Sequence, residues 1–386
     1  MSNGPIAPNP VDRPLRLAYL ADPNSVHTRR WLGFFADRGH DVHLLVGAGD
    51  VVAPGLANAI EIHPYRRFGR RRLPLVSSIQ GRGELRALLT ALAPDVLHAH
   101  FVNRYGWQAR LSGFHPYAVT PWGSDLLVTP RRSRRARWWG RATLRSADLV
   151  TVAGEHLAAA ARDLGAHPDR IRLIQFGVDT DRFRPHVPDA AIRARLGLGG
   201  RRVLFSPRAL TPIYQHETVL RGVAAMPSDV VLLSGARHAD PAYARSLRAL
   251  ADELGIGDRF VVMPEFAEAD VPDLFALADV VVSVPASDGI PVTVLEAMAS
   301  GTPVIASDLP GPRACLAGHE DLLVPVADPM ALAAALVRVL AMGLPEREAL
   351  GSRLRATVVD RYEFRTNMLA MEQAYRELAA RAVGDR

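Results

Sequence analysis

Two carboxylates, Asp288 and Glu296, flank a Gly-Ile-Pro turn in the stretch SVPASDGIPVTVLEAMASGTPVIAS at 283–307. Carboxylate oxygens accept hydrogen bonds from hydroxyl groups. The N–H groups that open a helix after such a turn attract an anion such as diphosphate. A nucleotide sugar carries ribose, diphosphate and hexose in that order, so the stretch predicts Glu296 at the ribose and Asp288 at the sugar. The simpler alternative is that Asp288 caps the helix and Glu296 is solvated.

Arg208 follows the apolar run RVLFS at 202–206. An Arg guanidinium donates two parallel hydrogen bonds to phosphate oxygens. At the end of a strand it would neutralise a leaving diphosphate, where electrostatic stabilisation is large because water is scarce. We therefore predict that Arg208 binds the donor and acts in catalysis, with a surface Arg as the alternative.

The segment TPWGSDLL at 120–127 offers a second group of candidates. Trp122 cannot accept a proton, but its ring can stack on a sugar face. Asp125 is the nearest carboxylate for orienting an acceptor hydroxyl, and a turn cap is the alternative. In DVLHAHF, His98 and His100 share one strand face by their spacing of two. We predict His100 at the acceptor and a buried, hydrogen-bonded His98.

All these residues follow short apolar runs that alternate with amphipathic ones, which is typical of parallel α/β layers. In the first half we expect strands at 15–21, 41–48, 95–101, 117–122, 148–154 and 171–177, and helices near 28–38, 79–92, 105–112, 134–145 and 155–164. In the second half we expect strands at 202–208, 230–236, 259–264, 279–285, 303–307 and 321–326, and helices near 217–225, 243–254, 271–278, 292–300, 330–340, 346–362 and 366–381.

Ligands of open α/β sheets bind beyond the carboxyl ends of the strands. We therefore add Ser25, His27 and Asn103, which follow strands of the first half, to the predicted acceptor-binding group. A chain of 386 residues favours two domains. We expect the linker at 180–188, where the sequence is polar and contains Pro. The fold class is thus α/β, with two Rossmann-like doubly wound domains facing one another across a cleft.

At these residues the chain resembles the retaining glycosyltransferases of family 4, which have the GT-B architecture. The family signature is an acidic residue, seven residues and a Glu that opens a run like EAMASGTPVI; here these are Asp288, GIPVTVL and Glu296. IQFGVDTDRF at 174–183 and YEFRTNMLAMEQAYREL at 362–378 also resemble family segments. The resemblance covers about Leu15 to Glu377.

The resemblance implies a nucleotide-diphosphate sugar donor, bound in the C-terminal domain, and retention at the anomeric carbon. It implies a disordered lead-in at 1–14, an acceptor domain at 15–183, a donor domain at 184–365 and a helix at 366–386 that crosses back to the first domain. UDP and GDP sugars are the usual donors of the family. The acceptor alternatives are a saccharide, a lipid-linked molecule and a small natural product.

The donor turn implied by the family comprises Gly289, Ile290 and Pro291. Four features depart from the family pattern, one being that Gly289 and Pro291 lie two positions nearer to the acidic residue than is usual in the family. The first acidic residue is Asp in place of Glu, Trp122 stands where a His is usual, and no Lys follows Arg208. His216 and Tyr214 occupy that region, and His216 is our candidate for the further donor contact.

The family reaction implies a front-face displacement. Positive charge develops on the anomeric carbon as the leaving group departs, while Arg208 and the donor turn hold the diphosphate charge. A diphosphate oxygen takes the acceptor proton, so no strong protein base, metal or cofactor is required. Asp179 and Asp181 have the D-x-D spacing of metal sites in another architecture, but we interpret Asp181 as a helix cap and Asp179 as hinge structure.

The charge of the chain favours an anionic partner. The formal net charge is +6, the pI is about 9.9, and Arg residues cluster at 66–72 and 131–141. An anionic membrane surface is an additional expected partner, and nucleic acid is not expected. No secretory signal or apolar run of about 18 residues occurs, and Cys315 is the single cysteine. We expect a cytoplasmic protein, or one at the inner face of the membrane.

Two other classes of function stay open. One is a nucleotide-sugar epimerase of the same architecture, which would consume donor without an acceptor. The other is a non-catalytic protein that binds membranes or anionic ligands through the Arg clusters. An NAD enzyme is poorly supported, because VGAGDVV at 46–52 lacks the third Gly of the dinucleotide fingerprint.

Overall fold

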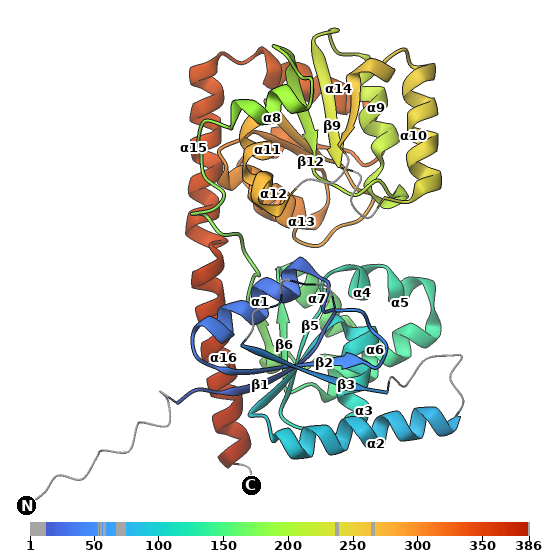
Figure 1. Cartoon of the computed structure of the whole chain (residues 1–386), viewed down its shortest axis with the longest axis vertical. Coiled ribbons are helices and arrows are strands. Elements are labelled where there is room, and N and C mark those ends of the chain that lie inside the picture. Colours follow the sequence, from blue (N-terminus) through green and yellow to red (C-terminus); the bar gives the residue numbers. More distant parts are fainter. Residues whose placement is uncertain are drawn as a thin grey trace, which may run out of the picture. The chain divides into compact units, whose positions relative to one another are not determined.

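The structure is a computed structural model that describes residues 13–52, 54, 56, 59–66, 75–235, 239–263 and 267–384. The chain divides into two units (Figure 1). The first unit comprises Met1–Gln175 and Thr366–Arg386, and the second comprises Phe176–Arg365. Residues 1–12 of the predicted disordered lead-in and residues 67–72 of the Arg cluster lie outside the described residues. The predicted disorder is wrong at Arg13, whose guanidinium forms an ion pair with Asp95.

Within the described residues, the first unit contains a seven-stranded parallel sheet of order β3-β2-β1-β4-β5-β6-β7. Its strands are β1 Arg16–Leu20, β2 Asp41–Gly47, β3 Ile60–Tyr65, β4 Val96–His100, β5 Tyr117–Thr120, β6 Leu149–Val152 and β7 Ile171–Leu173. Its helices are α1 Val26–Asp37, α2 Leu75–Leu92, η1 Phe101–Gly106, α3 Trp107–Ser112, α4 Ser124–Leu127, α5 Thr129–Arg132, α6 Arg134–Ser146, α7 Glu155–Asp163 and η2 Pro168–Arg170. Helix α1 covers one face of this sheet, and α2 and α3 cover the other (Figure 1).

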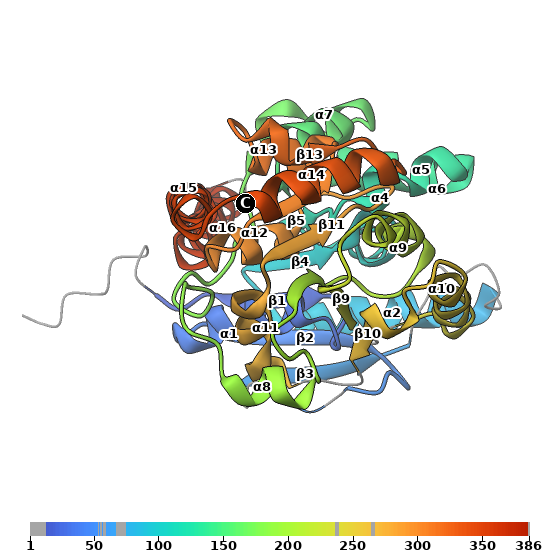
Figure 2. The ribbon, with the colours of Figure 1, turned by 90° about the horizontal axis from the view of Figure 1, so that it is seen from above.

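The described part of the second unit contains a six-stranded parallel sheet of order β10-β9-β8-β11-β12-β13. Its strands are β8 Arg202–Ser206, β9 Val230–Gly235, β10 Phe260–Met263, β11 Val280–Ser283, β12 Val304–Ser307 and β13 Leu323–Val324. Its helices are α8 Ala190–Arg195, η3 Pro212–Tyr214, α9 His216–Ala224, α10 Pro241–Glu253, η4 Gly257–Arg259, η5 Glu268–Asp270, α11 Val271–Leu277, α12 Val292–Ala299, α13 Pro310–Cys315, η6 Glu320–Leu322, α14 Pro329–Ala341 and α15 Leu344–Arg361. Helices α10 and α15 lie on opposite sides of this unit in Figure 1 and again in Figure 2.

Both sheets are doubly wound, as predicted. The strand order reverses between β1 and β4 in the first unit and between β8 and β11 in the second. These reversals leave a crevice beyond the strand ends, where doubly wound folds bind their ligands. The inner strands are buried because helices cover both faces of the sheet, and every residue of β4 and β11, for example, is buried. The edge strands β3 and β7 contain exposed residues.

The predicted boundary after residue 183 lies too late in the chain. Phe183 is fully buried and packs against Phe275, with ring centroids 5.7 Å apart. Val178 N–H donates to the carbonyl of Tyr362 at 2.8 Å. The stretch after Gln175 therefore belongs to the second core. The predicted helix cap is also corrected, because Oδ1 of Asp179 accepts from the N–H groups of Asp181 and Arg182.

The last helix, α16 Phe364–Gly384, completes the core of the first unit from Thr366 onward. The Tyr375 side chain is fully buried, and its hydroxyl lies 3.3 Å from that of Tyr19. The Trp31 indole N–H donates to the same hydroxyl at 3.2 Å, and Nδ1 of His98 lies 2.5 Å from it. These buried partners fix α16 against the sheet.

Several elements were not expected, among them the short helices α4, α5, α8 and α13, the strand β3 and the π-helix η1. No strand is expected at 60–65, but β3 forms there as the edge of the sheet; its sequence IEIHPY buries only Ile60 and Tyr65, so it carries no apolar run. Directly after β4 the chain forms a π-helix, η1, in which Phe101 has a φ of 71°.

Among the described helices, none alone is long and apolar enough for a membrane span, whereas α14 and α15 pass that test as a pair bent by 113°.

Candidate active site

The first group of predicted residues lies at the strand-order reversal of the second unit. Arg208 follows the end of β8, and Asp288 follows the end of β11. The two side chains form an ion pair, although they are 80 positions apart in the sequence. The guanidinium carbon of Arg208 also lies 4.5 Å from the centroid of the Tyr214 ring. The side chain of Arg208 is only 10% exposed, so the alternative of a surface Arg is wrong.

The donor turn leads into α12. Pro291 is the N-cap of this helix, and no side chain caps the helix. Asp288 therefore does not cap α12; its Oδ1 accepts from the Gly289 N–H at 2.9 Å. The hydroxyl of Thr293 is buried, with no hydrogen-bond partner among the described residues. The first turn of α12 thus offers uncapped N–H groups and a hydroxyl to an anion.

Gly311 of α13 packs directly against the donor turn. A Cβ atom at this position would lie 1.6 Å from the carbonyl oxygen of Gly289. Only a glycine allows this approach. The donor turn is thereby held in place by a second segment, which sequence reasoning did not identify.

Glu296 is buried within α12, with 9% of its surface exposed, so the alternative of a solvated Glu296 is wrong. Burial lowers the pKa of Arg208, while the negative charge of Glu296 raises it, which indicates that the two side chains interact. An arginine keeps its charge in proteins. The group at the end of β8 therefore combines the buried cation Arg208 with the acidic side chains of Asp288 and Glu296.

His216 begins α9 and is fully buried. Its Nε2 lies 3.2 Å from the Ser206 hydroxyl, and its backbone N–H donates to the Tyr243 hydroxyl at 3.0 Å. Burial and, to a smaller extent, the positive charge of Arg208 lower the pKa of His216 to about 4. His216 is thus neutral at pH 7 and does not replace the cationic charge of a Lys.

The second group lies at the strand-order reversal of the first unit and consists mainly of aromatic rings. The His27 and Trp122 rings stack with centroids 5.1 Å apart. His100, at the end of β4, lies 5.6 Å from Trp122 and 5.0 Å from Trp31 by the same measure. The structure therefore brings together His27, His100 and Trp122. Trp31 joins them without having been predicted, because a Trp on the apolar face of a helix is indistinguishable from a core residue.

Asp125 is buried and holds the turn before α4. Its Oδ1 accepts from the N–H groups of Trp122 and Gly123 at 3.0 Å, and its Oδ2 accepts from Val102 N–H at 2.8 Å. Burial raises the pKa of this carboxyl, while the backbone donors oppose the rise. Asn103 Nδ2 donates to the Asp125 carbonyl at 2.9 Å. These bonds give Asp125 and Asn103 a positioning role, and contact of either residue with an acceptor stays a prediction.

His100 and His98 differ in their partners. His98 is buried and hydrogen-bonded as predicted, with Nε2 lying 2.7 Å from the Thr120 hydroxyl. Neither ring nitrogen of the buried His100 has a hydrogen-bond partner among the described residues. Burial and, to a smaller extent, the charge of His27 lower the pKa of His100 to about 3. His100 is therefore a neutral hydrogen-bonding group and a weak base. Ser25 caps α1, accepting from Thr28 N–H at 3.5 Å.

The fold and these two groups define the class of the protein, which is a GT-B glycosyltransferase. A model described as "Glycosyl transferase 4-like" matches residues 16–153, and a model described as "Glycosyl transferases group 1" matches residues 201–342. Sucrose-phosphate synthase from Thermosynechococcus elongatus superposes with a TM-score of 0.80 at 22% identity, covering 94% of this chain and 99% of that one. HepE from Anabaena, in complex with UDP and glucose, superposes with a TM-score of 0.77 at 17% identity, covering 94% and 100%.

Curated relatives extend the match over both units. The D-inositol 3-phosphate glycosyltransferase of Saccharomonospora viridis is 31% identical over 366 residues, which is 85% of this chain and 81% of that one. The enzyme of the same name from Streptomyces scabiei is 29% identical over 311 residues, or 74% and 69% of the two chains. The chain belongs to the group 1 glycosyltransferases and is a hexosyltransferase that uses a nucleotide sugar. The predicted family, fold class and reaction are thereby confirmed, and retention fits the family.

Proposed function

We propose that the second unit binds the donor with Arg208 and the first turn of α12 on the diphosphate, Glu296 on the ribose and Asp288 on the transferred sugar. The observation that carries this assignment is the buried Arg208 at the strand-order reversal, which pairs with Asp288 and interacts with Glu296. Its Nε is buried with no hydrogen-bond partner among the described residues, so a guanidinium donor is left for a ligand. A UDP sugar is our choice of donor, because HepE of the same fold was solved with UDP-glucose.

The ion pair between Arg208 and Asp288 suggests how the donor enters. In the structure, Asp288 neutralises the buried guanidinium of Arg208. An arriving diphosphate takes over the guanidinium through charge-assisted hydrogen bonds. The carboxylate of Asp288 is then released to accept bonds from sugar hydroxyls. An unpaired buried charge would cost several kcal/mol, and this exchange avoids one at every stage.

We propose a phosphorylated polyol as the acceptor, bound at the aromatic group of the first unit. Two relatives are named for an inositol phosphate acceptor, and the basic chain suits an anionic molecule. The stacked His27 and Trp122 rings offer an apolar face for a hydroxylated ring. Neutral His100 supplies a hydrogen bond to an acceptor hydroxyl.

The proton of that hydroxyl goes to a diphosphate oxygen of the leaving nucleotide. His100 is an unsuitable general base, because its pKa of about 3 lies far below neutral pH. Bond breaking at the anomeric carbon leads, and Arg208 with the first turn of α12 stabilises the charge that develops on the diphosphate.

The decisive experiment replaces Arg208. We expect Arg208→Ala to lower kcat/KM for a UDP sugar about 10²–10³-fold, as when one preorganised donor of the transition state is lost. Arg208→Lys should recover only part of the loss, because an ammonium cannot bind bidentately. The control is Arg248→Ala, since Arg248 likewise lies over an aromatic ring, that of Phe260, at 5.4 Å, but on the outer helix α10. Near-normal turnover in Arg208→Ala would overturn the assignment.

Several expectations remain proposals with simple tests. A thermal-shift panel of UDP and GDP sugars identifies the donor, because a ligand at a hundred times its Kd adds about 2.7 kcal/mol of stability.

Donor consumption without an acceptor would favour the epimerase alternative. Loss of transfer in a chelator, at an unchanged Tm, would contradict metal-independent transfer. Flotation with anionic vesicles at low salt tests the membrane contact, and fractionation of cells tests the cytoplasmic location.

A further inference from the structure

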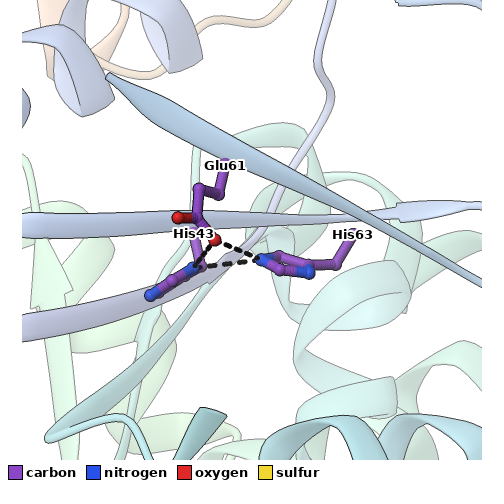
Figure 3. A group of neighbouring side chains, drawn as sticks. All are labelled: His43, Glu61 and His63. Atoms are coloured by element: carbon purple, nitrogen blue, oxygen red, sulfur yellow. Dashed lines mark hydrogen bonds and ion pairs between the residues drawn. The ribbon is translucent and has the colours of Figure 1, made fainter. Parts of the chain in front are cut away.

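A compact group of histidine and acidic side chains lies on the first sheet, away from the predicted acceptor residues. His43 is the third residue of β2, and Glu61 and His63 belong to the neighbouring edge strand β3. The two strands run parallel, with His43 opposite Glu61 and Leu45 opposite His63. Because alternate residues of a strand share one face, the three side chains converge. Figure 3 shows the three groups pointing toward one another.

The distances within this group suit a metal ion. Nδ1 of His43 lies 3.0 Å from Nε2 of His63 and 3.4 Å from Oε2 of Glu61, and Nε2 of His63 lies 3.6 Å from the same oxygen. A tetrahedral zinc ion binds nitrogen and oxygen at about 2.0–2.2 Å, so its ligand atoms lie roughly 3.3–3.5 Å apart. The three atoms thus form one face of such a tetrahedron with little movement.

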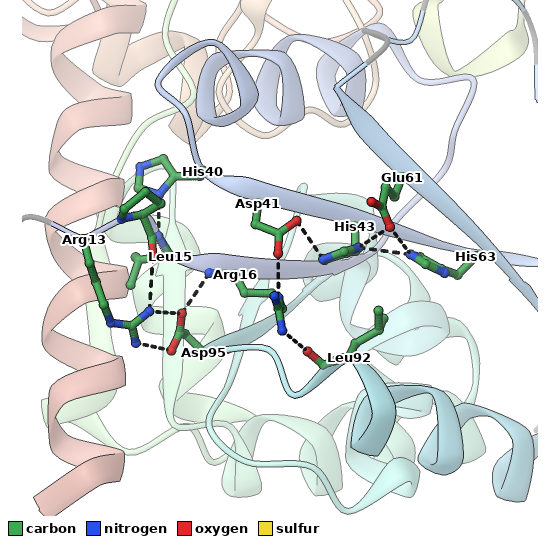
Figure 4. Close-up of polar contacts among 11 residues, drawn as sticks. Arg13, Leu15, Arg16, His40, Asp41, His43, Glu61, His63, Leu92 and Asp95 are labelled. Atoms are coloured by element: carbon green, nitrogen blue, oxygen red, sulfur yellow. Dashed lines mark hydrogen bonds and ion pairs between the residues drawn. The ribbon is translucent and has the colours of Figure 1, made fainter.

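A carboxylate lies beside the first of these ligands. Nε2 of His43 lies 3.0 Å from Oδ1 of Asp41, without the geometry of a hydrogen bond, so the carboxylate is next to the ring nitrogen opposite the one that points at the group. Asp41 is in turn fixed by Arg16, whose Nε donates to Oδ2 at 2.5 Å and whose Nη1 donates to the Leu92 carbonyl at 2.9 Å. Figure 4 shows this row of contacts. A carboxylate on the far nitrogen is how metal-binding histidines are usually oriented.

We propose that His43, Glu61 and His63 form a site for a divalent transition-metal ion, with Zn²⁺ as the expected metal and one coordination position left for water. Two imidazoles and a carboxylate favour zinc, cobalt, nickel or copper over magnesium and calcium, which prefer oxygen ligands. His43 is buried and the side chain of Glu61 is 67% exposed, so the ion has both a fixed ligand and a path from solvent.

The ion would join the edge strand β3 to β2. Edge strands lack a partner on one side and are held less firmly than inner strands. A metal bound by residues of both strands stabilises the folded state by its binding free energy. The candidate acceptor residues follow β1, β4 and β5 instead, so this site is separate from the predicted chemistry.

The test uses the full chain after removal of metals with a chelator. Titration with Co²⁺ should give the visible absorption of a tetrahedral ion, saturate at one equivalent and be reversed by Zn²⁺. Mg²⁺ should produce no binding at the same concentrations. Zn²⁺ should also raise the Tm of the wild-type chain.

Matched variants separate this site from scattered surface histidines. His63→Ala and Glu61→Gln should each weaken Co²⁺ binding at least about 10-fold and abolish the Zn²⁺-dependent rise in Tm. Asp41→Asn should weaken binding about 10–100-fold, as expected of a residue that orients a ligand. The control is His167→Ala, because His167 also faces a carboxylate, that of Asp169 at 3.6 Å, and should bind like wild type.

Two results would overturn the proposal. One is a wild-type chain that binds Co²⁺ or Zn²⁺ no more tightly than Glu61→Gln. The other is equal loss of binding in the His167 control. Glu61 is the safer substitution if His63→Ala fails to fold, because its side chain is largely exposed, and circular dichroism identifies such a failure.

Discussion

At the level of single residues, the donor group depends on one buried cation and its acidic neighbours. Arg208 is paired with Asp288 and lies over Tyr214, and Glu296 interacts with it from α12. The guanidinium of Arg208 stays charged at neutral pH although burial opposes the charge. The partners of Arg208 therefore determine its position before any ligand arrives.

Replacement of Glu296 tests the ribose contact. Glu296→Gln removes the charge but keeps the shape, and a hydrogen bond to a charged group is worth about 1.5–3 kcal/mol. We expect the KM for the nucleotide sugar to rise about 10–100-fold, with a smaller change in kcat because the ribose does not react. Steady-state kinetics with the donor varied will measure both.

The matched control for this prediction is Glu253→Gln, at an exposed position near the end of α10 in the same unit. It should leave both constants unchanged. A Glu296→Gln enzyme with a wild-type KM would remove the ribose from this carboxylate.

The residues of the donor group could be predicted from the sequence, whereas several structural roles could not. Asp288 and Glu296 stand in a recognisable spacing after an apolar run, and Arg208 follows another such run. The pairing of Arg208 with Asp288 depends on the neighbouring positions of β8 and β11, which only the sheet order gives. The bonds of Asp125 to three backbone N–H groups depend on a loop conformation that no residue periodicity records.

At the level of elements, buried strands were predictable and irregular ones were not. DVVVSVP predicts a strand because an apolar run of this length fits the interior of a parallel sheet, and β11 forms there. The edge strand β3 was missed because its sequence, IEIHPY, has no continuous apolar run and contains Pro64. The π-helix η1 was missed because Phe101 adopts a positive φ without being a Gly or Asn.

Close packing between α13 and the donor turn leads to a prediction at this level. In Gly311→Ala the new Cβ would overlap the Gly289 carbonyl, so the turn or the helix must move. We expect a loss of about 1–3 kcal/mol in the free energy of unfolding, as in other overpacked sites, and a weaker affinity for the donor. Urea titration and nucleotide binding will measure these two effects.

Gly83→Ala is the contrasting variant. Gly83 lies in the interior of α2 at an exposed position, and an added Cβ would meet no atom within 4 Å. Because Ala is the better helix former, this variant should gain about 0.5–1 kcal/mol. A Gly311→Ala chain as stable as wild type, with unchanged donor binding, would show that α13 does not hold the turn.

For the whole molecule, the buried histidines make stability depend on pH. His98, His100 and His216 are all buried, and burial lowers the pKa of each below 6.5, to about 3 for His100 and about 4 for His216. Below pH 6.5 the unfolded chain binds protons at these positions that the folded chain does not. The free energy of unfolding therefore falls as pH falls, by about 1.4 kcal/mol per pH unit for each group.

His216→Gln should make this dependence shallower. Between pH 6.5 and 5.0, an interval above the usual pKa range of carboxyl groups, the variant should lose about 1.6 kcal/mol less than the wild type, because one proton-linked group is gone. Urea titrations at the two pH values give the difference independently of any constant cost of the substitution. His167→Gln, at an exposed position, should retain the wild-type dependence. An equal pH dependence in His216→Gln and wild type would mean that His216 is protonated in the folded state. His216 would then have to be reassigned as a cation that meets the diphosphate beside Arg208.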